Sequence, residues 1–212
     1  MTKYILNPTI IPPLSNNKPK QAIVLCHGYG GDGKDISSLA INWRRFLPDA
    51  IFLCPNAPEI CSVNPNGYQW FDLSSEKEEI LLEKSLVAEE KLNEFLDQVL
   101  NNLELLPENL AVVGFSQGCM IAIQVSLKKK EKIGCVIGYS GKIINQKNLS
   151  NNINSKPSCF LMHGDSDTIV PPTHLLEAKE YLNKNGLKIK TKIFKNCEHR
   201  IPVEGLSLGL EF

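Results

Sequence analysis

The chain has 212 residues, 42% of them hydrophobic, which suits one domain of ordinary size with a substantial core. Its 23 Lys and Arg residues balance 23 Asp and Glu residues, so the charge gives no indication of nucleic acid or an anionic membrane surface as a partner. The seven cysteines are odd in number and lack zinc-ligand spacing, which predicts buried free thiols and no metal site. No signal peptide or integral membrane segment is indicated, and we expect a cytoplasmic protein.

Short apolar runs alternate with helix-compatible segments along the chain. Runs that are apolar on both faces suit parallel strands covered on each side, and the alternating run at 188–194 is typical of an edge strand. This order predicts one α/β domain over residues 1–212, with a mostly parallel, doubly wound sheet and helices on both faces. The predicted strands are 22–26, 50–53, 110–113, 133–137, 159–162 and 188–194, and the predicted helices are 35–46, 76–105, 119–129, 173–185 and a short one from 203.

Two other segments are predicted to be loops. The polar, Asn-rich stretch 143–155 is expected at the surface, and 55–73 is expected to be a long loop of the kind that often carries function. Within the longer loop, Trp70 and Phe71 either wall a pocket or anchor the loop to the core, and the residues leave both alternatives open. No insertion is long enough for a lid domain, so we expect an open site.

The segment Gly114-Phe115-Ser116-Gln117-Gly118 ends an apolar strand and begins a helix. Gly-x-Ser-x-Gly between a strand and a helix is the pattern of a nucleophile elbow, in which a sharp turn exposes the serine oxygen. The alternative is a tight strand-to-helix turn of a nucleotide-binding domain, with Ser116 as the helix cap. The rest of the sequence decides between these two interpretations.

A serine nucleophile needs a base and an acid that orients the base, and α/β-hydrolases place them in the order serine, acid, histidine. The only aspartates after Ser116 are Asp165 and Asp167, which follow an apolar strand, and the residues alone do not choose between them. His199 lies in the loop beyond the last predicted strand, where catalytic groups gather in open α/β sheets. His199 is therefore the predicted base.

The other two histidines after Ser116 are given lesser roles. His163 stands at a strand end before the acid and is expected to be structural, whereas His174 stands near a helix start and is expected to be exposed.

A glycine-rich loop at 26–33 follows the first apolar strand. It lacks the Gly-Lys-Ser/Thr ending of a phosphate-binding loop, and Gly-x-Gly-x-x-Gly does not fit in register. In an esterase, a His-Gly loop here donates one backbone N–H to the oxyanion, and the residue after the serine donates another. We therefore predict the N–H groups of Tyr29 and Gln117 as the oxyanion hole, with His27 bracing the loop.

These segments together resemble the phospholipase/carboxylesterase family of α/β-hydrolases, which includes acyl-protein thioesterases. The resemblance covers nearly the whole chain and lies in His27–Gly33, Pro55–Pro58 with Trp70-Phe71-Asp72, Gly114–Gly118, His163–Pro171 and His199. It implies an α/β-hydrolase fold and picks Asp167, the second aspartate, as the acid of the triad. It further implies hydrolysis of carboxylic esters or thioesters with short to medium acyl chains, no metal and no cofactor.

The chain departs from the family pattern at three places. Cys119 replaces a usual glycine, and we expect the helix-on-strand packing to survive because cysteine is small. Cys197-Glu198 replaces a glycine-rich lead to the histidine and is expected to stiffen that loop. The final helix, from Val203, is short.

The sequence therefore predicts a serine hydrolase that forms an acyl-enzyme on Ser116. The substrate is a small ester or thioester, with acylated proteins and lysophospholipids as further candidates. We expect substrate contacts at Trp70, Leu73, Ile169 and Val170, and a homodimer is expected because the family often forms one. The alternative from another class is a non-catalytic module of the same fold that binds an acyl ligand or a protein partner.

Overall fold

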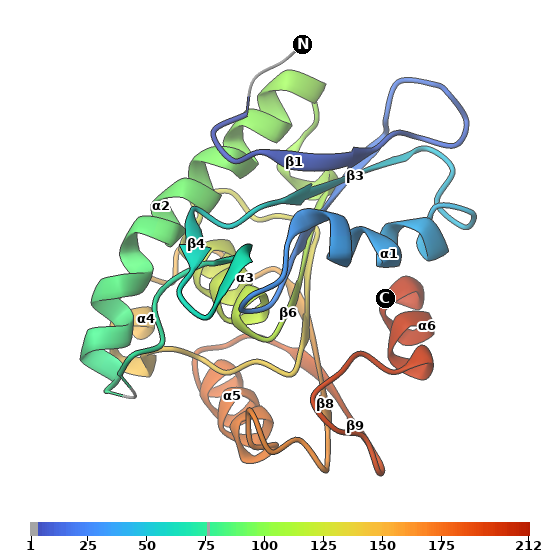
Figure 1. Cartoon of the computed structure of the whole chain (residues 1–212). Helices are drawn as coiled ribbons and strands as arrows, with labels where there is room; N and C mark the ends of the chain where they lie inside the picture. Colours follow the sequence, from blue (N-terminus) through green and yellow to red (C-terminus); the bar gives the residue numbers. More distant parts are fainter. Residues whose placement is uncertain (1–3, 76) are drawn as a thin grey trace.

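The structure is a computed structural model that describes residues 4–75 and 77–212. Its centre is a seven-stranded sheet in the order β1-β3-β2-β6-β7-β8-β9 (Figure 1). Every neighbouring pair is parallel except β1 with β3, so the predicted mostly parallel sheet is confirmed. The strands are β1 (Pro8–Ile11), β2 (Gln21–Cys26), β3 (Ala50–Pro55), β6 (Leu110–Phe115), β7 (Cys135–Tyr139), β8 (Ser158–Gly164) and β9 (Ile189–Phe194).

Helices cover both faces of this sheet (Figure 1). One face carries α1 (Gly33–Trp43) and α6 (Val203–Glu211), and the other carries α2 (Glu78–Leu103), α3 (Gln117–Lys128), α4 (Gln146–Ser150) and α5 (Thr173–Lys184). A short 3₁₀ turn, Pro107–Asn109, leads into β6. Within these described residues, no helix combines the length and the apolar character needed to cross a membrane.

Strand β2 is apolar from Ala22 to Cys26 because both faces of the strand are covered. Ala22, Val24 and Cys26 belong to the core under α2 and α3, whereas Ile23 and Leu25 belong to the core under α1 and α6. Successive side chains of a strand point to opposite faces, so a strand covered on both sides has no polar face. The predicted edge strand is β9, which indeed lies at the end of the sheet.

Several elements differ from the sequence prediction. The predicted loop 55–73 contains a hairpin of β4 (Glu59–Cys61) and β5 (Asn64–Gln69), and the predicted loop 143–155 contains α4. Strand β1 was not predicted, because it is a four-residue, partly exposed edge strand that begins with proline. The predicted helix start at residue 76 lies outside the described residues, and α2 begins at Glu78.

The hairpin is positioned by contacts with the glycine-rich loop rather than by its own strand propensity. The Gly30 N–H donates to the Tyr68 carbonyl (2.9 Å), and the Tyr68 N–H donates to the Gly31 carbonyl (2.8 Å). Asn64 Nδ2 adds a hydrogen bond to the Gly30 carbonyl at 2.7 Å. These long-range bonds explain why a segment rich in Asn, Pro and Gly forms strands.

Cys119 packs in space that two glycines leave open. A Cβ atom on Gly138 or on Gly141 would collide with the Cys119 side chain, so the sulfur occupies the place of two missing side chains. Burial raises the pKa of the Cys119 thiol to about 12, so the thiol is protonated and inert at neutral pH. The packing of α3 on the sheet therefore accommodates this departure from the family pattern.

The C-terminal end of α3 is tied to α2 by a lysine that is almost fully buried. The Lys129 side chain is 3% exposed and binds Asp97 Oδ1 at 2.5 Å and Asn93 Oδ1 at 3.0 Å. Beside it, Lys128 pairs with Glu89 at 2.6 Å. Both lysines stand at the C-terminal end of α3, where a positive charge also interacts favourably with the helix dipole.

We expect Lys129→Ala to lower the free energy of unfolding by roughly 1–3 kcal/mol, because the substitution removes charge-assisted hydrogen bonds and buried methylene packing. Lys130→Ala, at the exposed neighbouring position, is the matched control and should change stability by less than about 0.5 kcal/mol. Urea denaturation of both variants is the measurement. Equal effects at the two positions would show that the α2–α3 contact adds nothing to stability.

Candidate active site

Ser116 occupies the turn between β6 and α3 with φ 53° and ψ −119°. This is a conformation that residues with a side chain rarely adopt, and it is held by close packing. A Cβ atom on Gly118 would collide with the carbonyl oxygens of Cys26 and His27, so only glycine lets α3 start this close to β2. The Ser116 N–H donates to the Tyr139 carbonyl of β7 at 2.8 Å. The turn is thus fixed from two neighbouring strands.

Three of the predicted site residues form one hydrogen-bonded chain. His199 Nε2 lies 2.9 Å from Ser116 Oγ, and His199 Nδ1 lies 2.7 Å from Asp167 Oδ2. When Nδ1 carries the proton, it donates to the carboxylate, and Nε2 is free to accept the proton of the serine hydroxyl. The three side chains come from the ends of β6, β8 and β9, where the parallel strands share an edge.

Asp167 is held as an anion although its side chain is buried. Burial would by itself raise the pKa of the carboxyl, but the Val170 N–H, the His199 side chain and the Ile169 N–H together hold that pKa below its ordinary value. Oδ1 accepts from both backbone N–H groups at 2.9 Å, which leaves Oδ2 for the imidazole. The carboxylate is therefore oriented on both of its oxygens.

The structure separates the two candidate acids. Asp165 is exposed and accepts a hydrogen bond from Ser166 Oγ (2.8 Å), whereas Asp167 contacts His199. The loop that carries both is joined to the histidine loop, because the Asp165 N–H donates to the Phe194 carbonyl and the Ser166 N–H donates to the Cys197 carbonyl. Cys197, the second departure from the family pattern, is buried and takes part in this joint.

The other two histidines after Ser116 are His163, which was predicted to be structural, and His174, which was predicted to be exposed. His163 is buried, with Nε2 at 2.8 Å from the Val170 carbonyl and 3.2 Å from Asp167 Oδ2. Burial lowers its pKa, so its ring is neutral at pH 7 and braces the acid loop. His174 lies in the first turn of α5, 2.8 Å from Glu177, and is half-buried rather than exposed.

His27 connects the glycine-rich loop to the chain after β3. Its Nε2 accepts from the Ala57 N–H at 3.0 Å, and its Nδ1 donates to the Gly28 carbonyl at 2.7 Å. Burial lowers the pKa of His27, so the ring is neutral and can accept at Nε2. This geometry supports the predicted bracing role.

The two predicted oxyanion donors lie beside the nucleophile. The loop approaches Ser116 so closely that a Cβ atom on Gly28 would lie 3.3 Å from the Ser116 Cβ atom. Gln117 is the first residue of α3, so its N–H lies at the positive end of that helix. Within residues 4–75 and 77–212, neither the Tyr29 N–H nor the Gln117 N–H donates a hydrogen bond to another protein group. Both donors are thus available to a bound anion.

The side chain of Gln117 has a role that the sequence did not indicate. Its Oε1 accepts from the Trp70 N–H at 2.8 Å, and its Nε2 donates to the Phe71 carbonyl at 2.6 Å. The indole N–H of Trp70 in turn donates to the His27 carbonyl at 2.9 Å. One buried glutamine therefore fixes the segment after the hairpin to the nucleophile turn.

A cavity of about 410 Å³ opens next to Ser116. Three of the predicted substrate contacts, Leu73, Ile169 and Val170, line it, together with the apolar side chains of Phe71, Leu81, Met120 and Ile144. Trp70, the fourth predicted contact, is not among the residues that line this cavity. The Trp70 ring is fully buried and its indole N–H donates to the His27 carbonyl, so the ring anchors the segment while Phe71 lines the cavity.

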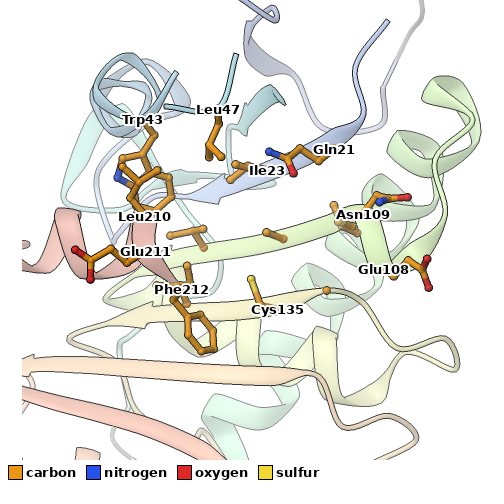
Figure 2. Close-up of a pocket in the computed structure, with 17 residues that line it drawn as sticks. Gln21, Ile23, Trp43, Leu47, Glu108, Asn109, Cys135, Leu210, Glu211 and Phe212 are labelled. Carbon is orange, nitrogen blue, oxygen red and sulfur yellow. The ribbon is translucent and has the colours of Figure 1, made fainter. Parts of the chain in front are cut away.

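A different hollow, of about 290 Å³, lies at the other edge of the sheet (Figure 2). It is lined by the first residues of parallel strands, such as Gln21, Leu110 and Cys135, and by the C-terminal Phe212. This hollow reaches along β6 as far as Val113, but it shares no lining residue with the cavity next to Ser116. The hollow at this edge therefore does not belong to the site around Ser116.

The described part of the chain also bears on metal binding. Nowhere in residues 4–75 and 77–212 do three or more His, Cys, Asp or Glu side chains gather in a way that could hold a metal ion.

Known proteins resemble this chain over nearly its full length. The family model Phospholipase/Carboxylesterase matches residues 8–212. Acyl-protein thioesterase 1 of Saccharomyces cerevisiae is 30% identical over 198 residues, which cover 85% of this chain and 86% of that protein. Acyl-protein thioesterase 1 of Emericella nidulans is 27% identical over 217 residues, covering 93% and 90%.

Solved structures agree with this relationship. The crystal structure of esterase PE8 is 35% identical and superimposes with a TM-score of 0.93, covering 98% of this chain and 97% of that one. The sheet order, the helices on both faces and these similarities confirm the α/β-hydrolase fold. The protein is a hydrolase, and it belongs to the phospholipase/carboxylesterase family.

Proposed function

We propose that this hydrolase cleaves carboxylic esters or thioesters with short to medium acyl chains through a Ser116–His199–Asp167 triad. The observation that carries the proposal is the unbroken hydrogen-bonded chain from Ser116 Oγ through the His199 ring to Asp167, with two free N–H groups beside it. A serine in this arrangement is activated as a nucleophile, because the imidazole can take its proton at neutral pH.

The reaction proceeds in two halves. Ser116 Oγ attacks the acyl carbonyl while His199 Nε2 takes the hydroxyl proton, and the carbonyl oxygen becomes an anion that Tyr29 and Gln117 bind through their N–H groups. The tetrahedral intermediate collapses, His199 gives its proton to the departing alcohol or thiol, and the acyl group stays on Ser116. Water then repeats the sequence with His199 as the base, which releases the acid and restores the serine.

Asp167 and the oxyanion donors supply the electrostatic part of catalysis. The imidazolium that forms on His199 lies 2.7 Å from a carboxylate kept anionic by backbone donors. Loss of one oxyanion donor costs about 10²–10³ in rate in enzymes of this chemistry. The protein would therefore depend on both the charge of Asp167 and the fixed position of the Ser116 turn.

The second candidate function is a non-catalytic module that binds an acyl ligand or a partner in the same cavity. The serine-to-histidine hydrogen bond favours the enzyme, because a pure binding site gains nothing from an activated hydroxyl. The names of the fungal relatives make S-acylated proteins one candidate substrate of this protein, beside small esters and lysophospholipids. The homodimer and the cytoplasmic location stay predictions.

We expect Ser116→Ala to abolish labelling by a fluorophosphonate probe and to lower kcat for a nitrophenyl ester by at least about 10³-fold. The physical reason is that His199 lies within hydrogen-bond distance of the Ser116 hydroxyl and can take its proton. Gel fluorescence and initial rates are the measurements. Full labelling of the alanine variant would remove the serine-hydrolase proposal and favour the binding module.

The two aspartates provide a matched pair. Asp167→Asn should keep the fold and lose about 10⁴-fold in kcat, because an amide no longer selects the productive imidazole tautomer. Asp165→Asn should keep most of the activity, since that side chain is exposed and contacts Ser166. Circular dichroism checks that both variants are folded. Greater loss of activity in the Asp165 variant would contradict the assignment of Asp167.

The cavity beside Ser116 sets a limit on the acyl chain. Each methylene that enters should gain about 0.8 kcal/mol in transition-state binding until the cavity of about 410 Å³ is full. We therefore expect kcat/KM for a series of nitrophenyl esters to peak at short or medium chains. A steady rise up to the palmitoyl ester would show that the acyl group is not confined to this cavity.

A further inference from the structure

Another open hollow, of about 360 Å³, also borders His199, on the side of the ring away from the cavity beside Ser116. Helix α1 contributes Ile36, Ser38 and Leu39 to it, and the chain after His199 contributes Ile201. This hollow and the cavity beside Ser116 share four residues, namely Gly28, Tyr29, Phe115 and His199. Ser116 lines only the cavity beside it, whereas His199 lines both spaces. The His199 imidazole therefore lies between two adjacent spaces.

The chemistry of acyl transfer assigns the two spaces to different parts of a substrate. The acyl group becomes bonded to Ser116 Oγ, so it must occupy the cavity that contains Ser116. The leaving atom must receive its proton from His199 Nε2, so it departs next to the imidazole. A group attached to that atom would continue past His199, and the hollow between α1 and Ile201 is the space that it meets.

We propose that this hollow is the leaving-group site and that it favours uncharged, apolar alcohols or thiols of about the size of one ring; the proposal rests on the proposed function. Its walls are the apolar side chains of Ile36, Leu39, Phe115 and Ile201. A space of this size lies at the lower end of the range for small-molecule sites.

The charges around the hollow argue against an ionic leaving group. Asp35 and Arg200 both line it, and both are exposed. One carboxylate and one guanidinium give no net attraction for either sign, and their exposure to water weakens each of them. His27, which also lines the hollow, has a pKa lowered by burial and stays neutral. The selective element is therefore the apolar surface.

The rate constant that reports this selection is kcat/KM. It covers the steps up to formation of the acyl-enzyme, in which the leaving group is still bound. Two esters with the same acyl group form the same acyl-enzyme, so its hydrolysis cannot distinguish them. A preference seen in kcat/KM at constant acyl group therefore reports the leaving-group side alone.

The test compares methyl hexanoate with benzyl hexanoate, whose alcohols have similar acidity, with each rate divided by the hydroxide-catalysed rate of the same ester. We expect kcat/KM to be at least about tenfold higher for the benzyl ester, because a ring gains contact with the apolar walls. Ser38→Trp, which fills the hollow from the exposed side of α1, should lower this ratio about tenfold. Ile41→Trp is the matched control, because Ile41 lies on the same helix, is 63% exposed and does not line the hollow.

A substitution on the acyl side completes the design. Leu73→Trp should shorten the preferred acyl chain and leave the benzyl-to-methyl ratio unchanged, whereas Ser38→Trp should do the reverse. Equal kcat/KM values for the two esters, or a ratio that Ser38→Trp and Ile41→Trp change alike, would overturn the leaving-group site. Absence of any ester cleavage together with no probe labelling of Ser116 would instead overturn the proposed function.

A measurement on the unmodified protein covers the case in which Ser38→Trp does not fold. An alcohol that binds in the hollow should also attack the acyl-enzyme, with His199 taking its proton, and form a new ester in place of the acid. With nitrophenyl hexanoate as the acyl donor, benzyl alcohol should yield at least about ten times more ester than methanol at equal concentration. Equal or greater yield from methanol would contradict the proposal.

Discussion

The left-handed backbone of Ser116 is the constraint on which the rest of the site depends. A serine with positive φ costs of order 1–3 kcal/mol and persists only where the surroundings allow no alternative. Here β7 holds its N–H, and α3 begins so close to the end of β2 that position 118 has no room for a side chain. The same close approach places the glycine-rich loop beside the serine. Ser116 and the proposed oxyanion donors are therefore positioned by one packing arrangement.

Asp167 and His199, the proposed acid and base, depend on a second arrangement, which extends the pairing of β8 and β9 beyond the sheet. The Asp165 N–H donates to Phe194 at the end of β9, and the Ser166 N–H donates to Cys197 in the following loop, so backbone hydrogen bonds bring the two loops together. A Cβ atom on Gly164 would collide with the Cys197 carbonyl, so this joint also requires close backbone contact. Asp167 Oδ1 then accepts from two backbone N–H groups, and Asp167 Oδ2 faces His199 at 2.7 Å and His163 at 3.2 Å.

These two arrangements explain what could and could not be predicted from the sequence. The elbow, the chain order of serine, acid and base, and the doubly apolar strands leave local patterns, so the parallel sheet and the positions of Ser116 and His199 were predictable. Asp167 could be chosen over Asp165 only by resemblance, because the choice depends on which carboxylate the folded loop turns inward. The hairpin at 59–69, the inward Trp70 ring and the Lys129 contacts with α2 had no local signal. Each is fixed by partners far away in the chain, namely Gly30, Gln117 and Asp97.

Gln117 and Phe115 are the chain neighbours of Ser116, and each connects it to other parts of the site. Gln117 holds the Trp70–Phe71 segment and so shapes the cavity on the serine side. The Phe115 ring packs against the His199 imidazole, with 4.9 Å between ring centroids, and borders both spaces. The segment after the hairpin lines the cavity beside Ser116, whereas α1 lines the space beyond His199, so different parts of the chain shape the two spaces. A substitution of a side chain in α1 is therefore expected to change the space beyond His199 and to leave the proposed triad in place.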